Sequence, residues 1–522
     1  MATQTELALP PAPRASAGPG APAGRLWDVG AVAVPAVVAL ALCLYQLTAR
    51  SLWLDEAATV AIASQHGSAL WSAMAHDGGN MLGYYALVHV LVGWFGTGAF
   101  AIRLPSAVAA GACSGVVALL GLRLFGRRAA LFAGLLAAVS LPLVFWGQDA
   151  RGYAPMMALV AGSFAAFAAG VQEPRRPGPW VAYVVCTALS MYASYVAVFA
   201  LPAQLVALAW RRQAWRQALV AMAVSAVCWI PLAVLAATRG GGQLFWIPRP
   251  SLTSEKQVVL ALTSAGFEPN FHPAAIAAVL AVVTVALLAV AAVRLVRRDA
   301  PWGVALALSW LLVPVLLMWV ESLVGQPIFT ARNLLVSLPA VALLLGWVVA
   351  QSRFAWPALA VLIALRALAL APSYGTSPEN WRAATAYVVR GERPGDCVAF
   401  YPQDARMPFA YYTGQPVKPY IERYETPRVP SGCARVWLVA SHQGQPTGPA
   451  ASRAHYARYV ALRDELAHRY ARSVTRSFGY ASVIWVELFY GRSVVPTNVS
   501  ALRTTSITPF THSRAVKARP RT

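Results

Sequence analysis

Charged residues are scarce in this chain: they make up 12% of its 522 residues, and lysine occurs only three times among the 42 basic residues. Soluble domains carry about 25% charged residues, so the composition excludes an ordinary soluble enzyme. Cysteine is also sparse, with six residues, which excludes a small secreted domain built on disulfides. Hydrophobic residues are abundant instead, at 58%, and gather in blocks close to the roughly 20 residues that cross a bilayer. The sequence therefore predicts a polytopic membrane protein.

The apolar blocks predict eleven membrane-spanning helices. Residues 1–27 precede them, are rich in Ala, Pro and Gly, and lack the apolar run of a signal peptide, so we expect a disordered cytoplasmic tail. Residues 28–371 then form the transmembrane domain. The predicted spans are residues 28–48, 99–124, 129–147, 154–171, 179–191, 195–210, 217–237, 272–293, 301–320, 333–350 and 355–371.

Arginines between the spans indicate which side each loop occupies. Twelve basic residues fall in five very short loops, near residues 127, 175, 212, 297 and 353, whereas seven are spread over the longer segments of the other side. By the positive-inside rule the short loops are cytoplasmic. The expectation is a multi-pass protein of the plasma membrane, with a cytoplasmic N-terminus and residues 372–522 outside.

Residues 372–495 change character and predict an extracytoplasmic α/β domain, because strands alternate there with helices. Residues 496–522 are expected to form a loose basic tail. Cys397 and Cys433 each precede a predicted strand, and the outer compartment permits disulfides, so we predict a bond between them. The predicted helices are residues 379–390, a short one before 417, and 451–471; the predicted strands are 398–401, 417–421, 434–440, 474–478 and 482–489.

Ionisable groups on the outer side are the most informative residues, because charge near a membrane is costly to bury. Four places on the outer side collect them, and none lies in the middle of a span in the pattern of a proton relay. The first follows the first span, where Asp55 and Glu56 begin a helix whose dipole favours their ionised form. Adjacent acids suit a general base that acts on a hydroxyl, and capping of an interfacial helix explains them equally well.

The second place is a glycine-containing loop and the helix that follows it. His76 and Asp77 lie in the loop, and Tyr84 and Tyr85 lie on a predicted amphipathic helix at the membrane interface. Loop capping accounts for most of these polar groups. Two candidate ligands are too few to indicate a metal site.

The third and fourth places carry arginines at the outer ends of spans. Asp149 and Arg151 follow the third span, and Arg332 precedes the tenth. Arginine binds phosphate through paired hydrogen bonds, so both arginines suit a lipid phosphate; a local ion pair and interfacial snorkelling are the alternatives. An aromatic outer loop that contains Trp246 could cover such a site.

Several short motifs follow one another along the chain: Trp53-Leu54-Asp55-Glu56-Ala57, Tyr84-Tyr85 with His89, Arg103-Leu104-Pro105-Ser106, Leu124-Phe125-Gly126-Arg127-Arg128, Gln148-Asp149-Ala150-Arg151-Gly152-Tyr153, Trp246-Ile247-Pro248 and Arg332-Asn333-Leu334-Leu335. In this order they resemble the GT-C glycosyltransferases that use polyprenyl-phosphate sugars, in the branch of the protein O-mannosyltransferases and the aminoarabinose transferases of lipid A. The resemblance covers nearly all of residues 28–371. The chain departs from the family at three places. It has Asn80-Met81-Leu82-Gly83 where the family commonly has a Pro-Pro pair before the tyrosines. It has Asp149 where the family usually has Glu, and Asn333 where the family usually has Tyr.

The resemblance implies an α-helical GT-C membrane protein that works as an inverting glycosyltransferase. Asp55, helped by Glu56, would take the proton of an acceptor hydroxyl at the outer face. Arg151 and Arg332 would stabilise the departing phosphate, and Asp149 would orient Arg151 or serve the acceptor or metal side. We therefore expect Asp55 to lie near both arginines. The residues given a substrate-contacting or orienting role are Asp149, His76, Asp77, Tyr84, Tyr85 and Trp246.

The implied partners are a polyprenyl-phosphate-linked sugar, with mannose as the first candidate, and a glycan, glycolipid or protein acceptor for cell-envelope or protein glycosylation. The protein works in the bilayer, and no nucleic acid is involved. No cofactor is assigned, because members of the family differ over a divalent metal. Two other classes stay open: a flippase of lipid-linked sugars, which would show inverted repeats and broken helices, and a non-catalytic anchor that presents residues 372–522.

Overall fold

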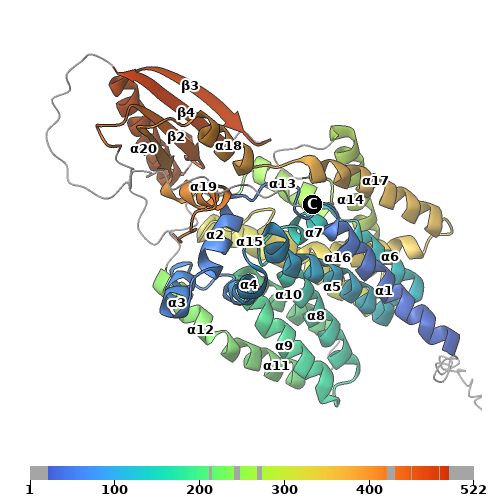
Figure 1. Ribbon diagram of the computed structural model, residues 1–522. Coiled ribbons are helices and arrows are strands. Elements are labelled where there is room, and N and C mark those ends of the chain that lie inside the picture. The colour runs from blue at the N-terminus through green and yellow to red at the C-terminus, as the bar shows by residue number, and fades with distance from the viewer. Residues whose placement is uncertain are drawn as a thin grey trace, which may run out of the picture.

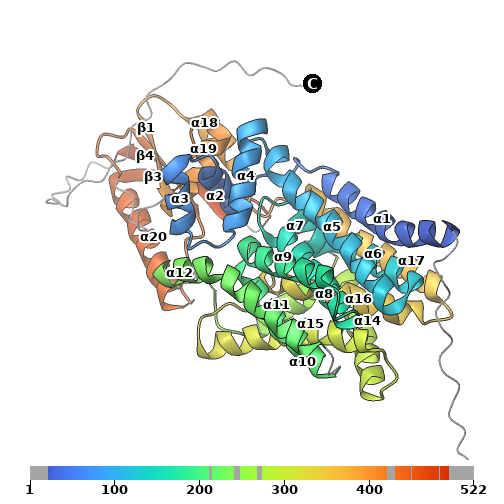
Figure 2. The same ribbon diagram turned by 90° about the horizontal axis from the view of Figure 1, so that it is seen from below.

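The computed structural model describes residues 22–210, 214–239, 247–266, 273–419, 429–447, 449–480 and 483–492. Helices form nearly all of the described part up to residue 375, and a four-stranded sheet lies within residues 396–492. Figure 1 shows the sheet at one end of the helical part, on the side of α2 (Leu54–Ala63). Figure 2 shows the same arrangement from below, with α19 (Arg406–Thr413) beside α2.

Each predicted span is helical, but the count of eleven is not confirmed. Seven described helical segments are long and apolar enough to cross a membrane, and two bent helix pairs raise the number to nine. The other two predicted spans coincide with α9 (Pro177–Ala193) and with the helical segment Tyr195–Trp210, which are shorter and are separated by the extended residue Ser194. The seven segments are α1 (Pro22–Leu44), α5 (Ala99–Phe125), α8 (Tyr153–Gln172), α14 (Ala274–Val296), α15 (Trp302–Val324), η3 with α16 (Asn333–Ser337, Leu338–Ala350) and α17 (Ala355–Gly375).

The bent pairs overturn the expectation of unbroken spans. α6 (Arg127–Ala138) meets α7 (Leu141–Gly147) at 57°, and α11 (Trp215–Cys228) meets α12 (Ile230–Arg239) at 46°. A proline stands at the second position of the later helix in both pairs, where it has no N–H to continue the preceding helix. The first helix also begins earlier than predicted, at residue 22 rather than 28.

A charged side chain lies buried within a predicted span. Arg366 of α17 is 1% exposed, and its Nη1 donates a hydrogen bond to the carbonyl of Leu136. This carbonyl belongs to the last turn of α6, where backbone acceptors lack partners within the helix. The arginine therefore stabilises the break between α6 and α7.

The remaining helices of this part lie between the spans along the chain. α3 (Gly67–His76) and α4 (Leu82–Phe95) follow α2, and α13 (Leu252–Leu262) precedes α14. α5 packs against α1, α6 and α8, and glycine permits one of these close approaches: a Cβ on Gly111 would lie 3.1 Å from the carbonyl oxygen of Ala36. Small residues allow helices to approach closely in this way where the surroundings are apolar.

The C-terminal part is an α/β unit, as predicted. Its strands are β1 (Asp396–Tyr401), β2 (Arg435–Ser441), β3 (Tyr470–Phe478) and β4 (Ile484–Arg492), in the order β1-β2-β4-β3. β1 and β2 are parallel, and β4 is antiparallel to both β2 and β3. The helices are α18 (Trp381–Gly391), α19 and α20 (Ala450–Arg469).

One predicted strand of this unit does not form in the described residues. Residues 417–419 of the predicted strand 417–421 are not in a strand, and the rest of that segment lies outside the described residues. The predicted basic tail, residues 496–522, also lies outside them.

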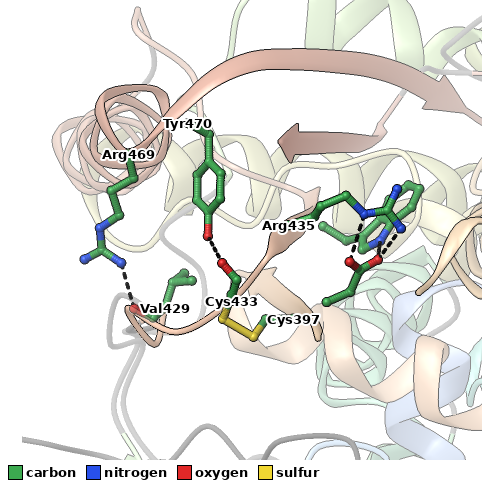
Figure 3. Close-up of a disulfide and its surroundings, with 8 residues drawn as sticks. Cys397, Val429, Cys433, Arg435, Arg469 and Tyr470 are labelled. Atoms are coloured by element: carbon green, nitrogen blue, oxygen red, sulfur yellow. Dashed lines mark hydrogen bonds and ion pairs between the residues drawn. A yellow bond between two sulfur atoms is a disulfide. The ribbon is translucent and has the colours of Figure 1, made fainter. Parts of the chain in front are cut away.

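The predicted disulfide between Cys397 and Cys433 is confirmed (Figure 3). Cys397 lies in β1, and Cys433 directly precedes β2, so the parallel pairing of the two strands brings the two cysteines together. The hydroxyl of Tyr470 donates to the carbonyl of Cys433 at 2.8 Å, and Arg469 donates to the carbonyl of Val429 at 2.8 Å. These contacts fix the start of β2 against the beginning of β3.

Candidate active site

The start of α2 brings Asp55 to two arginines from distant parts of the chain. One carboxylate oxygen of Asp55, Oδ2, lies 3.5 Å from Nη1 of Arg332 and 3.7 Å from Nη2 of Arg151. The Asp55 side chain is 29% exposed, compared with 26% for Arg332 and 10% for Arg151. The expectation that Asp55 lies near both arginines is confirmed, and its carboxylate is accessible from outside the protein.

Tyr85 and Asp77 extend this cluster and hold Arg151 in place. The Tyr85 hydroxyl accepts a hydrogen bond from Nη1 of Arg151 at 3.0 Å and donates one to Oδ2 of Asp77 at 2.9 Å. Because one guanidinium nitrogen bonds Tyr85 and another faces Asp55, the plane of Arg151 is restrained. Two further predicted residues, Tyr85 and Asp77, are thus part of the site.

Glu56 does not assist Asp55, which corrects the prediction. Its side chain is 1% exposed and pairs with Arg103 through two contacts of 2.6 Å. It also accepts a hydrogen bond from the backbone N–H of Ala150 at 2.9 Å. Burial raises the pKa of Glu56, but Arg103 and these hydrogen bonds outweigh the effect and hold that pKa below its ordinary value. Glu56 is an anion fixed inside the structure.

Asp149 does not orient Arg151 either. Its Oδ1 accepts a hydrogen bond from the indole of Trp53 at 2.7 Å, and its buried Oδ2 has no hydrogen-bond partner among the described residues. Burial raises the pKa of Asp149 well above its ordinary value, and the negative charge of Glu56 adds to the rise. Asp149 therefore holds Trp53, two residues before Asp55, and not the arginine.

The remaining predicted site residues make other contacts or lie outside the described residues. The Tyr84 hydroxyl donates to the carbonyl of Ile102 at 3.1 Å and lies 2.9 Å from the Ser106 hydroxyl, so it faces α5. His76 is the last residue of α3, directly before Asp77. Trp246 lies outside the described residues.

The side chains that commonly bind metal ions do not cluster in the described ranges. No group of three or more His, Cys, Asp or Glu side chains there is arranged to hold a metal ion. The prediction of a metal or of its absence thus stays untested.

The sequence did not predict that the C-terminal part reaches this site. The segment that leads into Asp55 is hydrogen-bonded by it: Tyr412 accepts from the N–H of Leu52 at 2.7 Å, and Glu379 accepts from the N–H of Leu54 at 3.1 Å. Arg382 donates through its backbone N–H to the Ser51 hydroxyl at 3.1 Å. The predicted helix over residues 379–390 was the feature of the sequence that lay nearest to these contacts.

Part of the chain matches a family of mannosyltransferases, and its fold matches that of solved glycosyltransferases. Residues 81–236 match the family model of dolichyl-phosphate-mannose-protein mannosyltransferases. No curated protein sequence matches the chain. The crystal structure of ArnT from Cupriavidus metallidurans bound to undecaprenyl phosphate superposes with a TM-score of 0.55 at 14% identity, over 88% of this chain and 98% of that one.

A second solved structure has the same fold. It is the archaeal oligosaccharyltransferase AglB from Archaeoglobus fulgidus in complex with an inhibitory peptide and a dolichol-phosphate, with a TM-score of 0.51 at 14% identity over 92% of this chain and 76% of that one. The helical part and the sheet therefore form the GT-C fold. Residues 81–236 thus match a glycosyltransferase family, and the chain as a whole shares the fold of two solved glycosyltransferases.

Proposed function

We propose that this glycosyltransferase moves a sugar from a polyprenyl-phosphate donor to an acceptor hydroxyl on the outer face of the membrane. The observation that carries the proposal is the carboxylate of Asp55, partly exposed and within 3.5–3.7 Å of two arginine nitrogens. A carboxylate serves as a base, and paired guanidinium groups bind a phosphate that gains charge as it leaves. The lipids bound in the ArnT and AglB structures are polyprenyl phosphates of this kind.

In this mechanism Asp55 takes the proton of the acceptor hydroxyl as its oxygen attacks the anomeric carbon. The bond between that carbon and the donor phosphate oxygen breaks on the opposite face, so the configuration inverts and the polyprenyl phosphate leaves with the bonding electrons. Arg151 and Arg332 stabilise the charge that builds on it. Each guanidinium has five N–H donors, so it can contact Asp55 and a phosphate together.

The proposed orientation in the membrane is argued from α5. Its first turn lies beside the site, because Arg103 pairs there with Glu56. Its other end, at Phe125, is followed by Arg127 and Arg128. Arginine-rich short loops face the cytoplasm, so the site and the sheet are assigned to the outside.

Mannose is the first donor sugar to test, since the matched family is named for a mannosyl donor. The acceptor is assigned only by class: a hydroxyl of a glycan, glycolipid or protein. Neither assignment alters the roles of Asp55 and the two arginines, because these act on groups that every such donor and acceptor has in common.

The test is transfer of labelled sugar from polyprenyl-phosphate mannose in membranes that carry wild type, Asp55→Asn or the control Asp464→Asn. Asp464 lies on α20 of the C-terminal part. We expect transfer by wild type and the control, and a loss of about 10²–10⁴-fold in D55N, the range of general-base catalysis. Equal transfer by D55N would remove Asp55 from the chemistry.

A panel of other polyprenyl-phosphate sugars follows if mannose is not transferred. Failure of the wild type with every donor would overturn the proposed function. Movement of intact labelled donor across the membrane, without transfer, would support the flippase instead.

A further inference from the structure

Glu379, a buried residue of the C-terminal part, joins three elements next to Asp55. It is 5% exposed. Its Oε2 accepts hydrogen bonds from the backbone N–H of Leu54 at 3.1 Å and from the indole of Trp381 at 2.8 Å. Its Oε1 lies 2.9 Å from Nε2 of His442. One carboxylate thus connects α2, α18 and the turn after β2.

The contact with Leu54 caps the helix that carries Asp55. The first N–H groups of a helix have no partner within it, and the residue before α2, Trp53, makes no side-chain capping bond. Glu379 supplies the missing acceptor from more than 300 residues away along the chain. Its negative charge also suits the positive end of the helix dipole. The next residue is Asp55, so this cap fixes the backbone from which the side chain of Asp55 projects.

His442 completes the arrangement from the edge of the sheet. Its φ of +51° is one that side-chain-bearing residues rarely adopt, and such conformations persist where the surrounding structure holds them. Glu379 holds this one through the ion pair. A residue kept in an unfavourable conformation beside a catalytic cluster is a candidate for a functional role.

The charges around His442 are those of the site itself. Loss of hydration lowers the pKa of His442, but the negative charge of Glu379 raises it by more. Asp55 raises it further, so the pKa lies above its ordinary value. Arg332 acts in the opposite direction. On α20, burial lowers the pKa of His455 to about 4, and the charges of Arg458 and then His442 add to the effect.

Resting on the proposed function, we propose that Glu379 and His442 are a positioning pair through which the C-terminal part sets the orientation of Asp55. The C-terminal part is then a piece of the active site and not a separate module attached to it. The pair is strongest when His442 is protonated, because the imidazolium attracts the Glu379 carboxylate and holds it in place as the cap of α2. It loosens as the pH rises through the pKa of His442 and the imidazole becomes neutral.

The first test measures the cap without measuring activity. Hydrogen–deuterium exchange of the full-length protein in detergent is compared for wild type, Glu379→Ala, Glu379→Gln and the control Glu465→Gln. Glu465 forms an exposed ion pair with Arg469 on α20. We expect at least tenfold faster exchange in peptides covering residues 53–58 for E379A, a smaller increase for E379Q, whose amide oxygen still accepts from Leu54, and none for E465Q. Unchanged exchange in E379A would overturn the proposal, whether or not the protein transfers sugar.

The second test separates positioning from mere stability, and it needs the transfer assay to work for wild type. For E379Q and His442→Asn we expect kcat to fall at least fivefold with little change in KM for the donor. We also expect the loss of wild-type activity with rising pH to disappear in H442N. If H442N keeps the wild-type pH profile, His442 has no such role. Failure of wild-type transfer concerns the proposed function alone, since the exchange experiment stands without it.

Discussion

Oδ2 of Asp55 lies 3.5 Å from Nη1 of Arg332, although 277 residues separate the two in sequence. Asp55 stands on the first short helix after the first span, and Arg332 directly precedes η3, which leads into α16. The contact exists only when the first and the late spans are assembled together. Both residues remain partly exposed, so the fold creates a charged site and leaves it accessible.

Removing the side chain of Glu56 is expected to lower the free energy of unfolding more than removing the side chain of Asp55. Glu56→Ala leaves Arg103 buried and unpaired, and breaking a buried ion pair in this way costs about 3–5 kcal/mol. Asp55→Ala breaks partly exposed contacts and changes the free energy of unfolding by about 1 kcal/mol or less. Thermal unfolding of the two variants in the same detergent measures the difference. Equal melting temperatures would contradict the assignment of Glu56 to a purely structural role.

The adjacent acids show where inference from sequence ends. Charge at the outer end of a span is costly, and this reasoning led to Asp55, Arg151 and Arg332, which the structure brings together. The same reasoning gave Glu56 a share in the chemistry. Successive residues of a helix point about 100° apart, so one acid faces the site and the other faces Arg103. Which one does so depends on how α2 packs against α5, and no local pattern encodes that.

The role of the C-terminal part was missed for a related reason. The alternation of its strands and helices was predicted from the sequence, and so was the disulfide between Cys397 and Cys433. Neither pattern indicates where such a unit docks. Glu379 and His442 reach the site through tertiary contacts alone. Glu379 bonds Leu54, which lies 325 positions earlier, and His442 contacts Glu379.

Loss of the Tyr85 hydroxyl is expected to weaken catalysis while leaving the fold intact. Tyr85→Phe removes the hydrogen bond to Arg151 and the one to Asp77. A hydrogen bond to a charged group is worth about 1.5–3 kcal/mol. If that amount is lost in the transition state, kcat/KM for the donor falls about 10- to 100-fold. Steady-state transfer kinetics with purified enzyme measure the change.

The adjacent tyrosine provides a matched control for this experiment. Tyr84→Phe also removes one hydroxyl, but that hydroxyl contacts Ile102 and Ser106 on α5. We expect Y84F to lower the melting temperature and to keep kcat/KM within about twofold of the wild-type value. An equal loss of kcat/KM in both variants would mean that Tyr85 supports the structure and not Arg151.

Replacing Asp149 by asparagine is expected to stabilise the folded protein. Because the pKa of Asp149 is raised, the folded protein keeps the proton of this carboxyl group to a higher pH than an unfolded chain does, which releases it above about pH 3.9. The unfavourable difference is absent below that pH, grows as the pH rises, and levels off once the pH passes the folded-state pKa. Asp149→Asn cannot ionise, and its amide oxygen can still accept from Trp53.

The melting temperature of D149N should therefore exceed that of wild type by a margin that widens as the pH rises above about 3.9. Asp149→Leu serves as the control: it has no charge but no acceptor either, so the Trp53 indole loses its partner at 2.7 Å and the gain should shrink or reverse. Transfer by D149N should stay close to wild type, because the contacts of Arg151 run to Asp55 and Tyr85. A D149N protein that is stable but inactive would place Asp149 in the chemistry after all, as a carboxyl group whose proton the reaction needs.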